Sequence, residues 1–221
     1  NMNEILGKLY NKKDLSIDES KLLFSKIMSG ETSDILISAI LTALKIKGET
    51  YDEIIGAVSV LREKSLKIKD SEDSIDTCGT GGDMLGTLNI STTAAIVAAS
   101  SGIKIAKHGN RSVSSKSGSA DVLEKLGIKI EKNINEIEDQ LKKINFCFMF
   151  AQSHHNAMKY VGKVRKELST RTIFNLIGPL LNPAGSKRQL LGVYDKKWLK
   201  THTEVLKYFG SEHVLVVNGF N

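Results

Sequence analysis

The sequence is poor in features that mark several familiar protein classes. It has only two cysteines, Cys78 and Cys147, which excludes a disulfide framework and indicates a reduced, cytoplasmic setting. It shows no signal peptide and no apolar run long enough to cross a bilayer, so we expect no membrane association. Aromatic residues make up 6% of the chain and do not alternate with arginine, as a base-stacking surface would require.

The composition instead indicates a globular, basic protein. Of 221 residues, 41% are hydrophobic, which is enough for one or two domains with buried cores. The net charge of +6 suits either nucleic acid or anionic metabolites. Many lysines share helix faces with glutamate, as in LREKSLKIKDSED, which is typical of a solvated surface. We therefore favour small anionic ligands and expect no nucleic-acid partner.

The first third of the chain predicts helices only. Ser16 with Glu19, and Thr50 with Glu53, have capping-box spacing, in which a side chain and a backbone N–H cap each other at a helix start. Gly48 is placed to end the helix between them. We expect a short helix before these, and together they form a small bundle.

From residue 75 onward, strand and helix patterns alternate. Beyond the strand that ends near Cys78, we expect strands at GIKIAKHG, IKIE, NFCFMFA, QLLGVYD and EHVLVVNG. Apolar strands separated by helices are typical of a mostly parallel α/β sheet. The expected fold is α/β, with a small all-helical N-terminal domain (residues 1–72, rejoined by about 166–186) and a larger α/β domain (73–165 and 187–221). Because the sequence stops directly after an apolar strand, we expect the C-terminal part of the fold to be absent.

A glycine-rich loop, DTCGTGGDMLGTLNIST, joins the first strand to a helix of small residues. Bare backbone and a helix amino end favour a bound anion, and neither a Walker A nor a GxGxxG pattern is present. Asp83 would repel a phosphate unless a cation lay between them, and Asn89 and Ser91 add oxygen ligands. The residues therefore favour a magnesium-bound polyphosphate. A tight turn with close helix packing remains an alternative for the loop, as does a dipole-favoured helix carboxylate for Asp83.

A second polar segment, KHGNRSVSSKSGSADVLEKLG, follows the next strand. Lys107 and Arg111 can neutralise phosphate there, and the serines can donate hydrogen bonds to its oxygens. The carboxyl ends of strands are where open α/β sheets bind ligands. A mobile serine-rich loop is the alternative, and His108 alone is equally typical of a packing residue.

A third segment places His154 and His155 after an apolar strand, with Arg165 ten residues later. No cysteine or carboxylate lies at metal-site spacing, so zinc is not indicated. A guanidinium suits an organic carboxylate, although a lone arginine is more often a surface residue. With no pattern for acid–base catalysis, the chemistry suggested is charge stabilisation and positioning.

The motifs DTCGTGGD, LNIST, KHGNRSVSSKSGSADVLEKLG and RTIFNLIGPLLNP together resemble the anthranilate phosphoribosyltransferases, through essentially the whole chain. The resemblance implies transfer of the phosphoribosyl group of phosphoribosyl diphosphate (PRPP) to the amine of anthranilate, in tryptophan biosynthesis. It also implies magnesium, a hinge between the two domains, and homodimers formed through the helical domains.

The resemblance also implies site residues. Ser91 matches a magnesium ligand, and no residue matches a catalytic acid or base. Positions that bind or adjoin anthranilate match Gly79, Asn110, His155, Arg165 and Gly178. PRPP-binding positions match Gly79, Gly82, Asp83, Thr87, Asn89, Ile90, Ser91, Thr92, Lys107, His108, Gly109, Asn110, Arg111, Ser112, Val113, Ser114, Ser115 and Ser119.

Two departures from the family pattern affect these expectations. The family carries a magnesium-binding Asp-Glu pair just past the strand in HVLVVNGFN, and the sequence ends before it. Asn156 replaces the usual proline after the histidines, and VGKVR is a variable version of its segment. We therefore expect these 221 residues to bind magnesium and PRPP weakly and to turn over poorly unless the missing part is restored.

Two other functions remain as alternatives. A pyrimidine nucleoside phosphorylase shares the architecture and a similar glycine loop, but it needs a different second loop from KHGNR. A non-enzymatic relative could bind nucleic acid through a basic surface, and it need not keep Asp83, Asn110 and Arg165 together.

Overall fold

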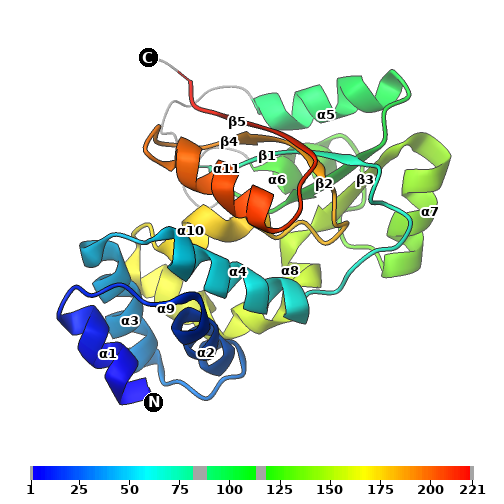
Figure 1. The fold of residues 1–221 in the computed structure, drawn as a ribbon. Helices are drawn as coiled ribbons and strands as arrows, with labels where there is room; N and C mark the ends of the chain where they lie inside the picture. Colours follow the sequence, from blue (N-terminus) through cyan, green and yellow to red (C-terminus); the bar gives the residue numbers. More distant parts are fainter. Residues whose placement is uncertain (1, 82–88, 113–117, 220–221) are drawn as a thin grey trace. The chain divides into compact units, whose positions relative to one another are not determined.

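The computed structural model describes residues 2–81, 89–112 and 118–219, which form two compact units (Figure 1). The helical unit comprises Asn1–Ser65 and His155–Leu181, and the sheet unit comprises Leu66–His154 and Asn182–Asn221. The chain passes from one unit to the other three times. Each passage comes earlier in the sequence than the domain boundaries expected after residues 72, 165 and 186. The first comes early because Leu66 donates a backbone hydrogen bond to the His154 carbonyl at 2.9 Å and Ile68 is buried in the sheet unit.

The helical unit is built from helices whose starts are encoded locally. Both expected capping boxes are confirmed: the Glu19 N–H donates to the Ser16 hydroxyl at 3.2 Å, and Glu53 and Thr50 repeat the arrangement at the start of α4. Gly48 ends α3 with φ +89°, as expected. The elements are α1 (Met2–Tyr10), α2 (Ile17–Met28), α3 (Asp34–Lys47), α4 (Tyr51–Lys64), η1 (Asn156–Met158), α9 (Lys159–Leu168), α10 (Ile173–Ile177) and η2 (Gly178–Leu180).

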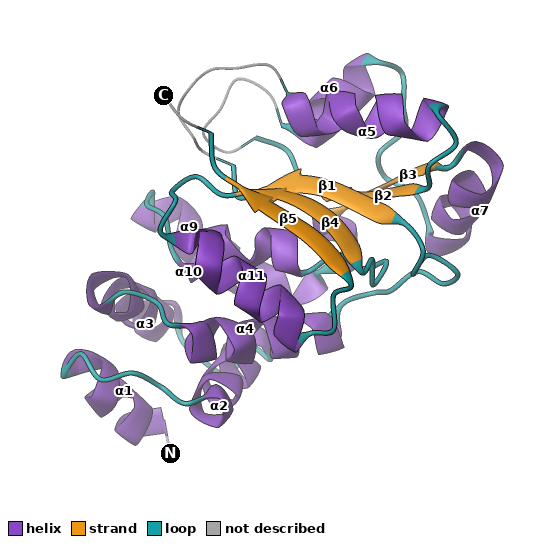
Figure 2. Cartoon of the chain, turned by 45° about the horizontal axis from the view of Figure 1, so that its top comes forward, coloured by secondary structure: helices purple, strands orange, loops and turns teal. Residues whose placement is uncertain are grey.

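The sheet unit has a five-stranded parallel sheet in the order β3-β2-β1-β4-β5 (Figure 2). The strands are β1 (Ile75–Gly79), β2 (Ile105–Gly109), β3 (Phe146–Phe150), β4 (Arg188–Gly192) and β5 (His213–Val217). The helices are α5 (Ile90–Ser100), α6 (Ser119–Lys125), α7 (Ile134–Ile144), α8 (Ala151–His154) and α11 (Trp198–Tyr208). No helix in the described part of the chain is long and apolar enough to cross a membrane.

Helices cover the sheet on both faces. On one face, α5 and α6 bury Ile105, Phe148 and their neighbours, and on the other α7 packs on Cys147 and Met149. As expected, β3 is buried along its whole length. On the α5 side, Leu190 of β4 and Leu215 of β5 are 38% and 57% exposed, so the described residues cover these two strands less than β1 to β3.

One expected strand is wrong. The segment IKIE (residues 128–131) is extended but forms no strand in the structure. Its alternation is real, since Ile130 is 3% exposed and belongs to the core beneath α5 and α6. The alternation of apolar and polar residues indicates that one side of the segment is buried. A strand also needs backbone hydrogen bonds to a neighbouring strand.

Candidate active site

The carboxyl ends of β1 and β4 form the switch point of the sheet. The strand order reverses there, since β2 and β3 lie on one side of β1 and β4 and β5 on the other. Open α/β sheets bind ligands in the crevice at such a point. Gly79 ends β1 opposite Gly192, which ends β4, and a Cβ on Gly79 would lie 3.3 Å from the Gly192 carbonyl oxygen. The sheet therefore presents bare backbone where the sequence predicts an anion.

The polar residues after the glycine loop form the first turn of α5. Asn89 is the N-cap, and its side-chain oxygen accepts a hydrogen bond from the Thr92 N–H at 3.3 Å. The Thr92 hydroxyl is buried, and within the described residues it has no hydrogen-bond partner. Buried polar groups normally have partners, and a helix amino end is positive. This turn therefore fits an anionic ligand with oxygen acceptors.

Lys107 brings a buried cation to the same turn. It lies in β2 and is 1% exposed. Its ammonium donates hydrogen bonds to the Thr77 carbonyl oxygen and, at 3.3 Å, to the Ser91 hydroxyl. Burial lowers the pKa of Lys107, and the nearby Asp76 carboxylate raises it. An ammonium directed at a helix amino end is a strong partner for phosphate oxygens.

A buried carboxylate that the sequence analysis did not single out, Asp76, lies in β1. Asp76 accepts a hydrogen bond from the His108 N–H at 3.4 Å and another from the Gln189 side-chain amide at 3.4 Å. The same amide donates to Cys78 Sγ at 3.0 Å. Burial raises the pKa of Asp76, and Lys107 lowers it. The sequence did carry a signal, because a carboxylate inside an apolar strand needs a partner and Lys107 lies in the next strand.

The second loop leaves β2 at Asn110 and rejoins the described chain before α6. Arg111, expected to neutralise phosphate, donates two hydrogen bonds to Glu124, at 2.5 and 2.8 Å. It donates a third to Asp121 at 3.3 Å. Ser119 starts α6, and its hydroxyl donates to the Asn110 carbonyl at 3.4 Å. The phosphate contact of Arg111 stays a prediction, and its charge is shared with two carboxylates.

The structure distributes the predicted donor-binding residues as follows. Six lie outside the described residues: Gly82, Asp83, Thr87, Val113, Ser114 and Ser115. The others lie at the carboxyl ends of β1 and β2, directly after β2, or in the first turns of α5 and α6: Gly79, Asn89, Ile90, Ser91, Thr92, Lys107, His108, Gly109, Asn110, Arg111, Ser112 and Ser119. The structure joins Lys107 directly to Ser91.

Three predicted anthranilate contacts belong to the helical unit. Arg165 lies in α9, where its guanidinium carbon is 5.5 Å from the centroid of the Phe174 ring and burial lowers its pKa. His155 is buried just before η1, and Gly178 begins η2. The other two, Gly79 and Asn110, belong to the sheet unit.

Magnesium fits this site only as a partner of the ligand. The described residues contain no group of three or more His, Cys, Asp or Glu side chains that could hold a metal ion. Ser91 Oγ is a hard oxygen of the kind magnesium takes, with the Lys107 ammonium 3.3 Å away. One protein oxygen suits a magnesium ion that is carried mainly by diphosphate oxygens, since this ion commonly keeps few protein ligands, and the diphosphate would offset the repulsion from Lys107.

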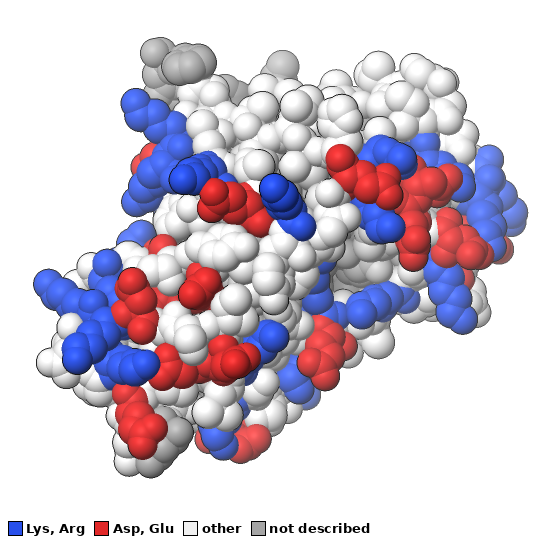
Figure 3. Space-filling model, viewed as in Figure 1, with Lys and Arg blue, Asp and Glu red and all other residues white. Residues whose placement is uncertain are grey.

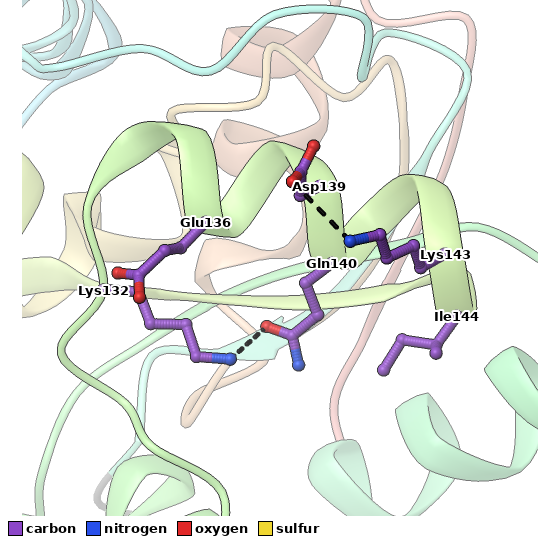
Figure 4. A pocket seen from close by; sticks show the side chains of 6 residues that line it. All are labelled: Lys132, Glu136, Asp139, Gln140, Lys143 and Ile144. Atoms are coloured by element: carbon purple, nitrogen blue, oxygen red, sulfur yellow. Dashed lines mark hydrogen bonds and ion pairs between the residues drawn. The ribbon is translucent and has the colours of Figure 1, made fainter.

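A shallow hollow along α7 is a poor alternative site (Figure 4). It is lined by Lys132, Glu136, Asp139, Gln140, Lys143 and Ile144. The Lys132 ammonium donates to the Gln140 side chain at 2.8 Å, and Lys143 pairs with Asp139 at 3.8 Å. Four of the lining side chains thus pair with one another, and none lies at the carboxyl end of a strand, so we assign no ligand to the hollow.

Comparisons with known proteins agree with this geometry. Residues 71–221 match the glycosyl transferase family, a/b domain, and residues 3–65 match the glycosyl transferase family, helical bundle domain. The chain therefore belongs to this glycosyl transferase family. Among curated relatives, the anthranilate phosphoribosyltransferase of Afipia carboxidovorans is 49% identical over 215 residues, which are 97% of this chain and 64% of that protein. The chain thus spans just under two thirds of that relative.

Solved structures give the same result. The anthranilate phosphoribosyltransferase of Thermus thermophilus is 40% identical with a TM-score of 0.90, over 97% of this chain and 65% of that one. The Saccharomyces cerevisiae enzyme in complex with PRPP and Mg is 30% identical with a TM-score of 0.87, over 96% and 64% of the two chains. The resemblance inferred from the motifs is confirmed, as is a helical domain followed by a parallel α/β domain.

Proposed function

We propose that this chain carries the donor site of an anthranilate phosphoribosyltransferase. The reaction transfers the phosphoribosyl group of PRPP to the amine of anthranilate, giving N-(5-phosphoribosyl)anthranilate and diphosphate, in tryptophan biosynthesis. One observation carries the proposal: the buried Lys107 ammonium meets the first turn of α5, where the Thr92 hydroxyl has no partner among the described residues. The relatives named above support the choice of substrates.

In the proposed reaction, the bond between the anomeric carbon of ribose and the diphosphate breaks as the anthranilate nitrogen attacks. Negative charge grows on the departing diphosphate, and Lys107 with the positive amino end of α5 stabilises it. Magnesium, when bound with Ser91 as a ligand, would neutralise the diphosphate further. An aryl amine is neutral near pH 7, so Asn110, His155 and Arg165 act by positioning, and Arg165 forms a fork with the carboxylate of anthranilate.

We also propose a homodimer formed through the helical unit and a cytoplasmic location. The dimer is supported by Ile35 and Ile46, which are 85% and 68% exposed and lie three turns apart on one side of α3. The location is supported by Cys78 and Cys147, which are both free and buried.

A nucleic-acid partner is not part of the proposal. On the face drawn in Figure 3, lysine and arginine side chains are interspersed with aspartate and glutamate. Pairs such as Lys26 with Glu31 at 3.1 Å and Lys104 with Asp73 at 2.9 Å show the same mixing. A continuous basic surface would be needed to follow a phosphate backbone.

Two measurements test the proposed function. Calorimetric titration with PRPP and magnesium should show weak but saturable binding, and a slow loss of anthranilate fluorescence should follow when both substrates are present. Consumption of thymidine with phosphate, in place of anthranilate with PRPP, would instead support a nucleoside phosphorylase. Salt-dependent DNA binding without any PRPP binding would refute the proposal.

A further inference from the structure

One carboxylate holds the two ends of the second loop together. Asp121, in the first turn of α6, accepts hydrogen bonds from the backbone N–H groups of Ser112 at 3.0 Å and Gly118 at 2.8 Å, both on Oδ2. Its Oδ1 accepts a hydrogen bond from Arg111 Nη1 at 3.3 Å. These donors lie on both sides of residues 113–117, so this one side chain joins the two ends of the loop.

A second carboxylate of α6 fixes the guanidinium. Both oxygens of Glu124 accept hydrogen bonds from Arg111, at 2.5 and 2.8 Å, and such a bidentate pair sets the plane of the guanidinium. Backbone hydrogen bonds from Ser112 and Gly118 lower the pKa of Asp121, and the hydrogen bond from Arg111 lowers the pKa of Glu124. Both carboxylates are therefore ionised near neutral pH and engaged by the base of the loop.

The backbone at this base is packed closely. A Cβ on Gly118 would collide with the Ser112 nitrogen and would lie 2.7 Å from the Asn110 carbonyl oxygen. The same carbonyl accepts a hydrogen bond from the Ala120 N–H at 3.2 Å. The start of the loop and the start of α6 therefore form one backbone unit that admits no side chain at Gly118.

We propose that Asp121 and Glu124 are positioning residues of the donor site, which hold the ends of the second loop through Ser112, Gly118 and Arg111. Arg111 then acts as the tether of the loop rather than as a ligand of phosphate. The identity of the ligand rests on the proposed function, but neither carboxylate matches a donor or an anthranilate position.

Electrostatics lead to the same assignment. Two free carboxylates near a diphosphate site would repel the ligand. Their charge is instead offset in part by the guanidinium and by backbone N–H groups, so less negative charge faces the donor.

Asp121→Asn and Glu136→Gln form a matched pair for the test. Each changes the acidic residue at the third position of a helix in the sheet unit, and in each the side chain accepts a hydrogen bond from the N-cap backbone. Glu136 caps Asn133 and pairs with Lys129 at 3.7 Å, and it contacts neither end of the second loop in the described part of the chain. We expect Asp121→Asn to weaken PRPP binding about tenfold, measured by calorimetry with magnesium. The neutral amide oxygen is a weaker acceptor for the two backbone N–H groups, and the amide NH2 would face the donor of Arg111. Glu136→Gln should lose similar stability and keep its PRPP affinity.

Amide exchange measured by NMR separates this inference from the proposed function. Exchange at Ser112 and Gly118 should be faster in Asp121→Asn and unchanged in Glu136→Gln. Unaltered PRPP affinity in folded Asp121→Asn overturns the proposal. If that variant is unfolded, Glu124→Gln takes its place: about threefold weaker PRPP binding supports the proposal, and unaltered affinity overturns it. If the parent chain does not bind PRPP, the proposed function fails, and unchanged exchange at Ser112 and Gly118 overturns the inference independently.

Discussion

The Lys107 ammonium lies 3.3 Å from the Ser91 hydroxyl and also donates to the Thr77 carbonyl, so β2 places a buried positive charge at the start of α5. The amino end of a helix is itself positive, so the Lys107 ammonium and the amino end of α5 place two positive charges side by side. Burying a charge costs free energy unless a partner relieves it. Asp76 relieves part of this cost, and the diphosphate proposed above would relieve more of it.

Removal of the Lys107 charge should weaken donor binding. Lys107→Met keeps most of the side-chain volume, and we expect PRPP to bind about 10- to 100-fold more weakly, since a charge-assisted contact is lost. Calorimetric titration with magnesium measures this. Lys104→Met is the control, because Lys104 lies just before β2 and pairs with Asp73 at 2.9 Å. An equal loss of affinity in both variants would contradict a specific role for Lys107.

Asp76 and Lys107 should be coupled in stability. Both side chains are buried. Lys107 lowers the pKa of Asp76 and Asp76 raises the pKa of Lys107, so each favours the charged form of the other. Asp76→Asn or Lys107→Met leaves one buried charge without its counter-charge, so we expect each to lower the free energy of unfolding by about 2–4 kcal/mol. The double variant should lose clearly less than the sum. Urea unfolding of the four chains measures the cycle, and strict additivity would show that the two charges do not interact.

Arg165→Lys should weaken the binding of anthranilate and leave the binding of PRPP unchanged. A lysine keeps the charge but loses the fork for a carboxylate and the contact with Phe174. We expect anthranilate to bind about tenfold more weakly while PRPP affinity is unchanged. Anthranilate fluorescence and PRPP calorimetry measure the two affinities, and Lys166→Met, at an exposed position of the same helix, is the control. A parallel loss of PRPP affinity would instead indicate general damage to the protein.

Local signals made the helical unit and most strands predictable. Capping boxes such as Ser16 with Glu19 act within one helical turn, so the sequence contains all their parts. The strand wrongly expected at IKIE shows the limit of periodicity. Burial of Ile130 produces the same alternation as a strand, but pairing depends on which backbone lies alongside, and that is decided elsewhere in the chain.

The chemistry of anion binding led us to expect the glycine loop and Lys107 in the candidate site, and their contact with a ligand stays a prediction. The partners that these residues have within the protein were not predictable. The hydrogen bond between Asp76 and Gln189 joins residues 113 positions apart, and nothing local signals it. Arg111 was expected to neutralise phosphate, and that contact stays a prediction. In the structure it pairs with Glu124 in α6, and an ion pair between residues 13 positions apart across a loop has no periodic signature in the sequence.

Gly118→Ala should lower the free energy of unfolding, whereas Gly162→Ala should not. A methyl group on Gly118 would press on the backbone of Ser112 and Asn110, so we expect a loss of about 1–3 kcal/mol in the free energy of unfolding, together with weaker PRPP binding. Gly162 lies exposed in α9 with open space around it, and alanine there should add roughly 0.5–1 kcal/mol. Urea unfolding compares the two variants, and equal effects would contradict the close packing at the loop base.

Stability should decline in alkali because of a buried thiol. Cys147 is fully buried in β3, and burial raises its pKa to about 12. The folded state disfavours the thiolate, whereas the unfolded chain ionises near pH 8.5, so this contribution to stability is complete below that value and is lost as pH rises toward about 12. From pH 7 to 9.5, the parent chain should therefore lose about 1 kcal/mol more than Cys147→Ala in urea unfolding. Because only the difference between two pH values is compared, the cavity left by the substitution cancels, and equal losses would mean that the thiolate is tolerated in the folded sheet.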